Sequence, residues 1–505
     1  MTLKSYAVPP EIRALKPSEP SCFVKVIKGR YYVYEHLRVR DESTGKMKNA
    51  SGKVLGRIDP VRGYIPNSDK VVSDDVSIVN FGEYAIAQVN SLSVSKKLLE
   101  FFNEDDARKI YVMGIIWMIN GYTYIKNYKP LYEQSWLSVV YPDLALGEES
   151  VSEFLKTLGR RHQRIEKFEQ SLIDDGSGLI AIDGHVMLSC SNECDMASFG
   201  NKYRKLGNEQ QNFMTVFDVD RNHPLSVSAF DGGTLEKTEV KNLFNRYSFA
   251  NAVFIVDSGF YSPSNIKLFS ENGNKYVVPL PGTYTKIYNQ MKPEGGFAGE
   301  FTYKKGSGKK SHASIISYKD KIIGGKRYIL FRDEEMRLKQ KAEYRALIGI
   351  EEGFTEEKYE ELQEGFGTIL LETNMEDSTQ KVYETYKKRW KAETYYNHVK
   401  NSLNAKGVHK QDYYTLQGES FIMEVEGLIY SEFMKVLQNN KEKTVRGKSE
   451  NECIKLAAYQ KLSKHLDGVW HKNEIRSNVK EFLLAMNVDV DRISHDGMLA
   501  CSADA

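Results

Sequence analysis

The sequence has few cysteines, no long apolar run and almost no net charge. Its five cysteines are an odd and scattered set in a chain of 505 residues, which argues against a disulfide framework and fits a reducing cytosol. The longest apolar stretch, Tyr111–Ile119, is too short to cross a bilayer, and the first residues lack the apolar core of a secretion signal. We therefore expect a cytoplasmic protein with no membrane partner.

The composition is that of a soluble globular protein of two to four domains. Hydrophobic residues make up 41% and charged residues 27% of the chain, and the formal net charge is +2. A chain with so little net charge is no polycation, so any nucleic-acid surface must come from local charge asymmetry.

Residues 1–74 predict an N-terminal arm followed by a small antiparallel sheet. Residues 22–62 hold ten Lys and Arg residues against four acidic ones. These basic residues alternate with Tyr31, Tyr32 and Tyr34, a combination that suits DNA contact and equally suits an exposed sheet with solvated charges. The ten basic residues are Lys25, Lys28, Arg30, Arg38, Arg40, Lys46, Lys48, Lys53, Arg57 and Arg62.

Residues 75–175 have helical periodicity, and we expect a helical region there. One predicted helix, over 150–174, carries a run of basic residues. This run is either a DNA-facing helix surface or an ordinary solvated face. Its members are Arg160, Arg161, His162, Arg164 and Lys167.

Residues 176–281 predict the first part of an α/β core, with elements in the order β-β-β-α-β-α-β. This order implies a mixed sheet with helices packed on its faces. Asp183 and Asp257 are each expected at the carboxyl end of an apolar strand, which is where α/β sheets place ligands. Either residue alone is more often a turn former or a helix cap.

The rest of the chain predicts an interruption, a return to the core and a helical end. Residues 282–367 read as a β-rich insertion, basic over 282–345 and acidic after it. Residues 368–413 bring the chain back as a strand and the second part of the core. Residues 414–505 are expected to be helical and to serve in dimerisation or core packing.

One helix, Thr379–Leu403, is expected to carry an unusual polar stripe. At about 100° per residue, its members lie within about 60° of one another. Taken alone, Arg389 and Glu393 are an ordinary ion pair on a surface helix. The members of the stripe are Tyr386, Arg389, Glu393 and Lys400.

Three carboxylates, those of Asp183, Asp257 and Glu393, are candidates for a shared metal site. Carboxylates brought together repel one another unless a cation lies between them. Oxygen ligands suit Mg²⁺ or Mn²⁺, and a pair of such ions supports in-line phosphoryl displacement. Tyr386, Arg389 and Lys400 would then bind flanking phosphates.

The sequence resembles the DDE transposases of the insertion-sequence-four type, which have an RNase H-like catalytic core. The order Asp183, Asp257, Glu393 is similar to their catalytic triad, and the spacing of Tyr386, Arg389, Glu393 and Lys400 matches their YREK signature. Thr373–Asn374, Trp390 and the element Leu55–Asp59 strengthen the resemblance.

The resemblance implies metal-dependent cut-and-paste transposition of an insertion sequence. The implied partners are the terminal inverted repeats of the element and target DNA, and the implied assembly is a homodimer in the synaptic complex. The implied site of action is the bacterial nucleoid. Nicking, hairpin formation and strand transfer are the expected steps. Trp390 is either a base-stacking residue or a core tryptophan. His185 is either a residue near the site or a structural histidine.

Three other functions fit parts of the sequence. A DNA-binding descendant without catalysis is disfavoured because all three acidic residues are present. An RNase H-like nuclease without strand transfer differs from a transposase only in joining DNA. A hydrolase of small phosphoesters leaves the basic insertion and the Tyr386–Lys400 stripe unexplained.

Overall fold

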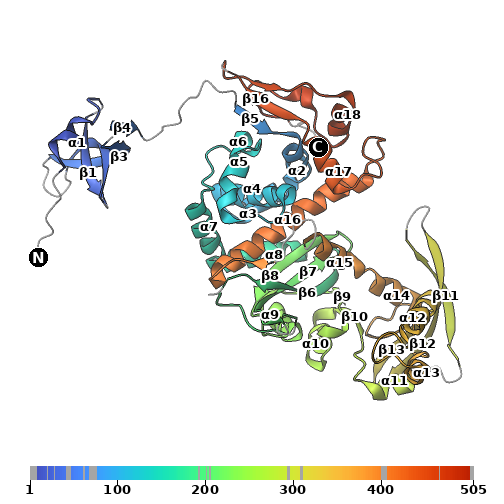
Figure 1. Cartoon of the computed structure of the whole chain (residues 1–505). Coiled ribbons are helices and arrows are strands. Elements are labelled where there is room, and N and C mark those ends of the chain that lie inside the picture. Colours follow the sequence, from blue (N-terminus) through green and yellow to red (C-terminus); the bar gives the residue numbers. More distant parts are fainter. Residues whose placement is uncertain are drawn as a thin grey trace, which may run out of the picture. The chain divides into compact units, whose positions relative to one another are not determined.

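The computed structural model describes residues 8–500, apart from residues 20, 28, 41–46, 61–62, 67–76, 192–193, 201, 204–205, 293–295, 307–310, 400–406 and 466. Contacts divide the chain into two compact units (Figure 1). The first comprises Met1–Ser77 with His465–Asp467, and the second comprises Ile78–Lys464 with Gly468–Ala505.

The N-terminal unit contains a four-stranded antiparallel sheet, which confirms the small β-region expected there. The strands pair in chain order: β1 (Cys22–Ile27), β2 (Arg30–Arg40), β3 (Met47–Asp59) and β4 (Gly63–Pro66), after the short helix α1 (Pro10–Ala14). A small core of Ile12, Cys22, Val33 and Ile58 holds the sheet together. Lys25 Nζ lies 4.9 Å from the centre of the Tyr34 ring, so at least one of the basic residues rests on an aromatic one.

A helical region follows, as expected for residues 75–175. After β5 (Ser77–Asn80) come α2 (Gly82–Asn90), α3 (Leu92–Phe101), α4 (Glu104–Asn120), α5 (Tyr128–Glu133), α6 (Leu137–Val140), α7 (Glu148–Arg160) and α8 (His162–Asp174). The helix predicted over 150–174 is wrong as a single element, because the chain turns at Arg161, whose ψ is 33°. Arg161 pairs with Asp106 at 2.6 Å, so this basic residue has an acidic partner within the fold.

The centre of the second unit is a mixed sheet with the RNase H-like strand order. Its central strands run β10-β9-β6-β7-β8 across the sheet. The meander β6, β7, β8 is antiparallel, whereas β9 runs parallel to β6 and β10 parallel to β9. The strands are β6 (Leu179–Ser189), β7 (Gln210–Asp218), β8 (His223–Phe230), β9 (Val253–Ile255) and β10 (Lys275–Pro279), with α9 (Glu236–Arg246) and α10 (Pro263–Leu268) between them.

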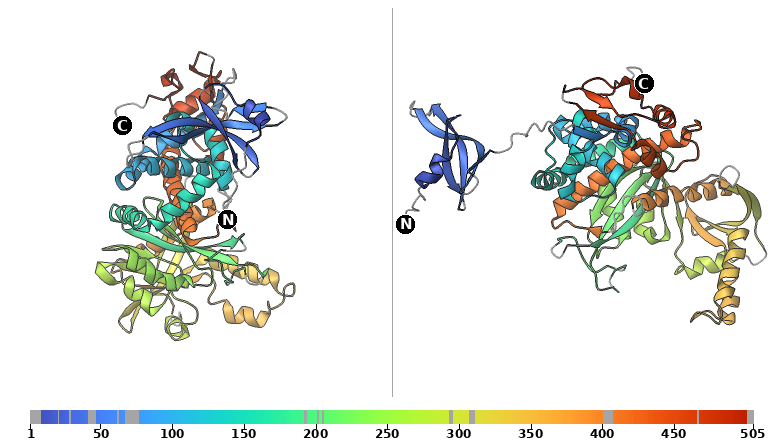
Figure 2. Two further views of the ribbon diagram at one scale, coloured as in Figure 1. Left: turned by 90° about the vertical axis from the view of Figure 1, so that its left-hand side faces the viewer. Right: turned by 45° about the horizontal axis from the view of Figure 1, so that its top comes forward.

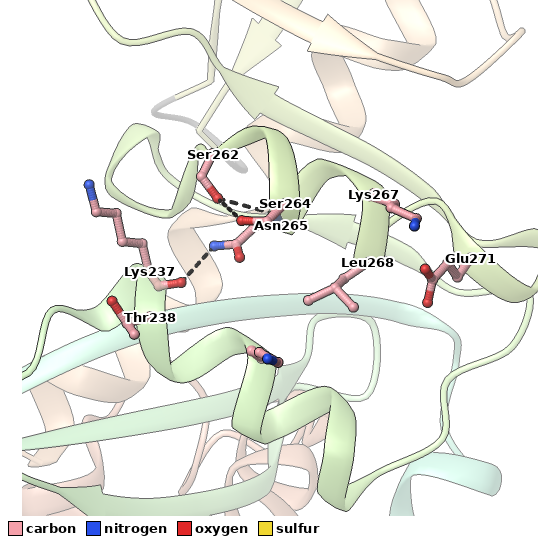
Figure 3. Close-up of a pocket in the computed structure, with 9 residues that line it drawn as sticks. Lys237, Thr238, Ser262, Ser264, Asn265, Lys267, Leu268 and Glu271 are labelled. Atoms are coloured by element: carbon pink, nitrogen blue, oxygen red, sulfur yellow. Dashed lines mark hydrogen bonds between the residues drawn. The ribbon is translucent and has the colours of Figure 1, made fainter.

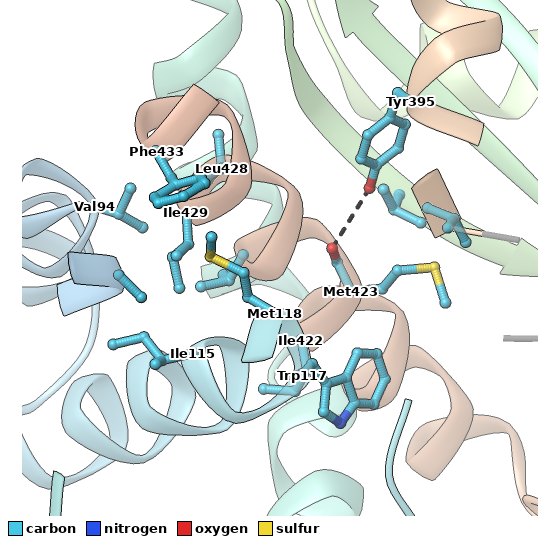
Figure 4. Close-up of a cluster of buried hydrophobic side chains, with 14 of the residues drawn as sticks. Val94, Ile115, Trp117, Met118, Tyr395, Ile422, Met423, Leu428, Ile429 and Phe433 are labelled. Atoms are coloured by element: carbon cyan, nitrogen blue, oxygen red, sulfur yellow. Dashed lines mark hydrogen bonds between the residues drawn. The ribbon is translucent and has the colours of Figure 1, made fainter. Parts of the chain in front are cut away.

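The two faces of this sheet belong to two separate hydrophobic clusters. Along β6, Ile180 and Ile182 lie in one cluster, whereas Ala181 lies in the other. This alternation is what a strand buried on both faces requires. The cluster that contains Ala181 extends into α2–α4 and into the long helix α16 (Tyr413–Asn439), as Figure 4 shows for Ile115 and Trp117 beside Ile422 and Ile429.

The β-rich insertion extends the central sheet. Its strands add to the edge in the order β11-β12-β13-β14-β10. They are β11 (Gly299–Lys305), β12 (His312–Ile323), β13 (Lys326–Asp333) and the returning strand β14 (Thr368–Thr373). The helices α11 (Thr285–Met291), α12 (Glu334–Leu347) and α13 (Glu356–Leu362) accompany them.

The C-terminal part is not wholly helical, so the expectation for residues 414–505 is partly wrong. After α16 and α17 (Glu450–Ala457), the strands β16 (Lys461–Lys464) and β17 (Trp470–Lys472) precede α18 (Ser477–Ala485). Together with β5, which lies almost 400 residues earlier in the chain, these two strands form a sheet in the order β17-β16-β5. Such long-range pairing leaves little local signal in the sequence.

Helix α16 runs between the helices α2–α4 and the central sheet (Figures 1 and 2). Its crossing with α7 depends on two glycines. A Cβ on Gly159 would lie 1.9 Å from the Tyr414 carbonyl oxygen, and a Cβ on Gly418 would lie 2.1 Å from the Leu155 carbonyl oxygen. The two backbones therefore touch directly. Among the described residues, no helix is long and apolar enough to span a membrane.

Candidate active site

The pairing of β6 with β9 brings Asp183 and Asp257 next to each other. Ala181 and Ile255 are partners in this parallel pair, and each aspartate lies two residues further along its own chain. Residues two apart share a face of a sheet, and neighbouring strands lie about 4.8 Å apart. Both carboxylates therefore extend from the face that carries Ala181 and Ile255.

Asp183 lies within its strand, so its prediction as a strand-end residue is wrong. Strand β6 continues to Ser189 because its pairing with β7 extends as far as Leu188 and Gln210. Asp257 does follow the end of β9. Its Oδ1 accepts a hydrogen bond of 2.7 Å from the Gly259 backbone N–H, which fixes the carboxylate at the start of a short turn.

The predicted helix Thr379–Leu403 is two helices, α14 (Thr379–Lys387) and α15 (Trp390–Asn397). At the junction, Arg389 N–H donates to the Tyr386 carbonyl at 3.0 Å and Ala392 N–H to that of Arg389. These bonds span three residues, so the helix tightens there into a 3₁₀ turn. Its last predicted part, including Lys400, lies outside the described residues.

Helix α15 is anchored over the same face of the sheet. Ala392 and Tyr395 are buried, and the Tyr395 ring lies 5.5 Å from that of Phe217 in β7. The Tyr395 hydroxyl donates to the Met423 carbonyl of α16 at 3.5 Å (Figure 4). With Tyr395 fixed in this way, α15 lies against β6 and Glu393 is close enough to act on the charge of Asp183.

Electrostatic interactions join Asp183, Asp257, Glu393 and Arg389 into one group. Burial raises the pKa of Asp183 to about 6; the Arg389 charge opposes this rise, while Asp257 and Glu393 add to it. Arg389 forms an ion pair with Glu393 and a hydrogen bond with Tyr386. Burial also raises the pKa of the Tyr386 hydroxyl, so this side chain is a neutral hydrogen-bonding group at neutral pH.

Glu236, at the start of α9, is a fourth carboxylate that the sequence did not predict. Burial raises its pKa, and the charges of Asp257 and Asp183 raise it further. A Cβ on Gly184 would lie 2.1 Å from Glu236 Oε1, so the Glu236 side chain occupies the space that this glycine leaves. An acidic residue in the first turn of a helix is common for other reasons, so its sequence position carried no signal.

The two further candidates differ in exposure. His185 is buried and lies two residues beyond Asp183 on the same face of β6. Trp390 is 57% exposed, so the interpretation as a core tryptophan is wrong. Its ring is accessible beside Arg389.

The donor set fits a hard divalent cation in its chemistry. Carboxylate oxygens are the ligands that Mg²⁺ and Mn²⁺ prefer, and beyond the effect of burial the charges of Asp257 and Glu393 also raise the pKa of Asp183, so the three carboxylates lie within electrostatic reach of one another. In the described part of the chain, no three acidic, His or Cys side chains are gathered closely enough to hold a metal ion. The Glu393 carboxylate is paired with Arg389 instead.

Residues 174–421 match the family described as "Transposase DDE domain". This segment is similar to the DDE domain of transposases. It contains all of the central strands β6–β10, the insertion and both helices α14 and α15. The match ends within α16, so the N-terminal sheet, most of the helical region and α17–α18 lie outside it.

Among solved structures, the chain is similar to a piggyBac transposase in a synaptic complex with hairpin DNA. The sequence identity is 10% and the TM-score is 0.39, over 81% of this chain and 84% of that one. None of the curated proteins matches the sequence.

Proposed function

We propose that the protein is a metal-dependent DNA transposase of the insertion-sequence-four type that moves an element by cut and paste. The observation that carries the proposal is the convergence of Asp183, Asp257, Glu393 and Arg389 on one face of the sheet, within the segment that matches the transposase family. Two carboxylates come from neighbouring strands and the third from a helix across the sheet, as a DDE site requires.

The three carboxylates would hold one or two Mg²⁺ or Mn²⁺ ions. Such a cation, when bound, activates water and stabilises the leaving oxygen of a phosphoryl transfer. Asp257 is already fixed by the Gly259 N–H, and Asp183 is fixed within a paired strand. Glu393 accepts from Arg389 through one carboxylate oxygen, so it would have to leave Arg389 before both of its oxygens could serve a cation.

Arg389 and Tyr386 would bind phosphates that flank the cleaved bond. A guanidinium binds phosphate through two parallel hydrogen bonds, and the neutral Tyr386 hydroxyl donates one more. Once Arg389 leaves Glu393, its guanidinium can bind a phosphate and the Glu393 carboxylate can bind a cation. DNA binding by Arg389 and cation binding by Glu393 would therefore be coupled. Lys400 remains a predicted phosphate contact, and Trp390 a predicted base-stacking residue.

The partners in this proposal are double-stranded DNA at the terminal repeats of the element and at the target. A transposase that cuts both ends of an element has to hold them together, so we propose a homodimer in the synaptic complex, at work on the bacterial nucleoid. Nicking, a hairpin intermediate and strand transfer are the proposed steps. An RNase H-like nuclease without joining activity is the alternative.

The test mixes the purified protein and Mg²⁺ with labelled DNA that carries the element ends. The proposal expects nicked, hairpin and joined products. Nicks without joined products favour the nuclease, and intact DNA after binding favours a DNA-binding descendant without catalysis.

A further inference from the structure

A groove that includes Ser262, at the end of the loop after Asp257, is lined by three lysines. It lies between α9 and α10 and has a cavity volume of about 480 Å³ (Figure 3). Lys237 and Lys241 come from α9, and Lys267 comes from α10. Thr238, Ser262 and Ser264 add hydroxyl groups, and Glu271 adds one carboxylate.

The three lysines carry charge that the fold does not neutralise. All three side chains are exposed, and within the described part of the chain no ion pair involves them. Elsewhere on this unit lysines have acidic partners, such as Lys388 with Asp220 at 2.8 Å. A groove that holds three ammonium groups and several hydroxyls suits an anion with more than one charge.

The walls of the groove are held together by Asn265, which is 3% exposed. Its side-chain amide donates to the Lys237 carbonyl at 2.8 Å and to the Phe260 carbonyl at 2.9 Å. Its backbone N–H donates to Ser262 Oγ at 3.1 Å, and Ser262 bonds to Ser264 at 2.9 Å. The start of α9, the Asp257 loop and the start of α10 are therefore fixed to one another (Figure 3).

This frame connects the groove to the carboxylates. Lys237 directly follows Glu236, which lies within electrostatic reach of Asp183 and Asp257. Ser262 ends the loop that begins at Asp257. Each strand of a duplex carries a phosphate about every 3.4 Å along the axis, so DNA held at the carboxylates has further phosphates on either side of the cleaved bond. Lysine and hydroxyl groups are common phosphate contacts in protein–DNA complexes.

We infer that the groove between α9 and α10 binds backbone phosphates of the DNA strand next to the cleaved bond, through Lys237, Lys241 and Lys267. The inference rests on the proposed function, since it places this DNA beside the proposed active site. Because the groove contacts phosphates, it reads no sequence, and its contribution to affinity depends on salt.

The first test compares two triple variants for binding to a labelled 40-base-pair duplex of arbitrary sequence. One replaces Lys237, Lys241 and Lys267 with Ala; the control replaces the exposed residues Lys129, Lys443 and Lys455 with Ala, for the same change in net charge. Each phosphate contact adds about 0.9 to the slope of log K against log salt. The groove variant is expected to lose about 2–3 from that slope and about tenfold or more in affinity, while the control keeps the wild-type slope. Equal slopes for both variants overturn the inference.

A single substitution that removes a negative charge from the groove provides a second comparison of DNA affinity. Glu271→Gln removes the carboxylate from the groove and is expected to strengthen binding about twofold to threefold. Weaker or unchanged binding contradicts a phosphate site there. Inorganic pyrophosphate, added at the same ionic strength as a chloride control, separates free phosphates from DNA. Displacement of the duplex at micromolar pyrophosphate would make a free polyphosphate the ligand and overturn the assignment to DNA.

A second measurement uses the unmodified protein and does not depend on the folding of a variant. Lysine acetylation is read by mass spectrometry with and without the duplex. Lys237, Lys241 and Lys267 are expected to be protected by DNA, and Lys129, Lys443 and Lys455 are not. Full acetylation of the groove lysines under DNA overturns the inference. Nicking by the wild-type protein in Mg²⁺, measured in the same preparation, separates this failure from that of the proposed function.

Discussion

Arg389 donates a hydrogen bond to the Glu393 carboxylate one helical turn further along. The guanidinium of the proposed phosphate-binding residue is therefore paired with the carboxylate of the proposed metal ligand. The Arg389 side chain is 19% exposed and that of Glu393 is 50% exposed. An ion pair this open to water contributes little to stability, commonly less than about 1 kcal/mol. The pair is therefore weak enough to open when phosphate and metal compete for its two members.

Arg389→Ala is expected to reduce the steps after the first nick about 10- to 100-fold, because a hydrogen bond to a charged group contributes about 1.5–3 kcal/mol. Arg389→Lys keeps the charge and loses the forked geometry, so a partial loss is expected. The measurement is the yield of joined product per nicked end. Lys388→Ala is the matched control, because Lys388 pairs with Asp220 instead. Equal yields from the Arg389 and Lys388 variants contradict a phosphate role for Arg389.

The sequence predicted the central part of the fold well because each strand of the core is a continuous apolar run. The order of elements from β6 to β10 follows from those runs and from the helices between them. It missed the extent of β6, because Asp183, Gly184 and His185 together resemble a turn. Only the pairing with β7 continues that strand to Ser189. Likewise, no local feature marks the tightening at Arg389.

The acidic site was predictable in part for a similar reason. Asp183, Asp257 and Glu393 stand out through their places in or near strands and within the polar stripe of the helix. Glu236 does not, because it meets the other face of β6 at Gly184 and acts on Asp183 and Asp257 through its charge alone, which no sequence pattern encodes. The pairing of β5 with β16 and β17 is likewise not encoded in any local sequence pattern. It depends on chain segments that meet only in the folded protein.

Gly159→Ala and Gly418→Ala are each expected to destabilise the protein by about 1–3 kcal/mol or more. At both positions a new Cβ meets a backbone carbonyl of the other helix, which cannot rotate away. Gly147→Ala is the control, since a Cβ there meets nothing within 4 Å. Urea unfolding measures the difference. An unchanged midpoint for the Gly159 and Gly418 variants would show that α7 and α16 do not cross at these glycines.

Glu424→Gln is expected to leave stability within about 1 kcal/mol of the wild type. Burial, together with the neighbouring Glu169, raises the pKa of Glu424 well above its usual range, which favours the protonated carboxyl, and an amide replaces a protonated carboxyl closely. Its oxygen accepts from the Val227 N–H at 3.2 Å. Glu424→Ala removes that acceptor and is expected to cost about 1–3 kcal/mol. Equal losses in urea unfolding for the two variants would mean that the carboxyl is ionised.

The free energy of unfolding is expected to change with pH through the protonation of His398, which directly follows α15. Its Nε2 lies 2.8 Å from Glu426 and its Nδ1 lies 3.9 Å from Glu450, while the Tyr430 ring is stacked on it with 3.6 Å between ring centres. Although burial opposes it, the charge of Glu426 raises the pKa of His398 above 6.5. The imidazolium therefore adds stability that is fully present below about pH 6.5 and is lost as pH rises through the raised value.

His398→Gln is expected to remove this contribution. Burial raises the pKa of Glu450, which gives a loss of the same sign, but that group remains in the variant. The difference in unfolding free energy between wild type and variant should be largest near pH 6 and shrink towards pH 9, with a slope of at most about 1.4 kcal/mol per pH unit. A difference that grows with pH would contradict a protonated His398.

The most direct test of the proposed active site is DNA cleavage by Glu393→Gln in Mg²⁺, measured beside its DNA binding. Glutamine keeps the shape of the side chain and removes the charge that a metal ligand needs, so cleavage is expected to fall at least 10³-fold, on the order of one lost electrostatic contact in a catalytic site, while the affinity for the end DNA stays within about threefold of the wild type. Glu384→Gln, an earlier acidic residue of α14 that hydrogen-bonds Gln380, should cut DNA at the wild-type rate. Undiminished cleavage by the Glu393 variant would contradict the assignment of Asp183, Asp257 and Glu393 as the metal-binding set.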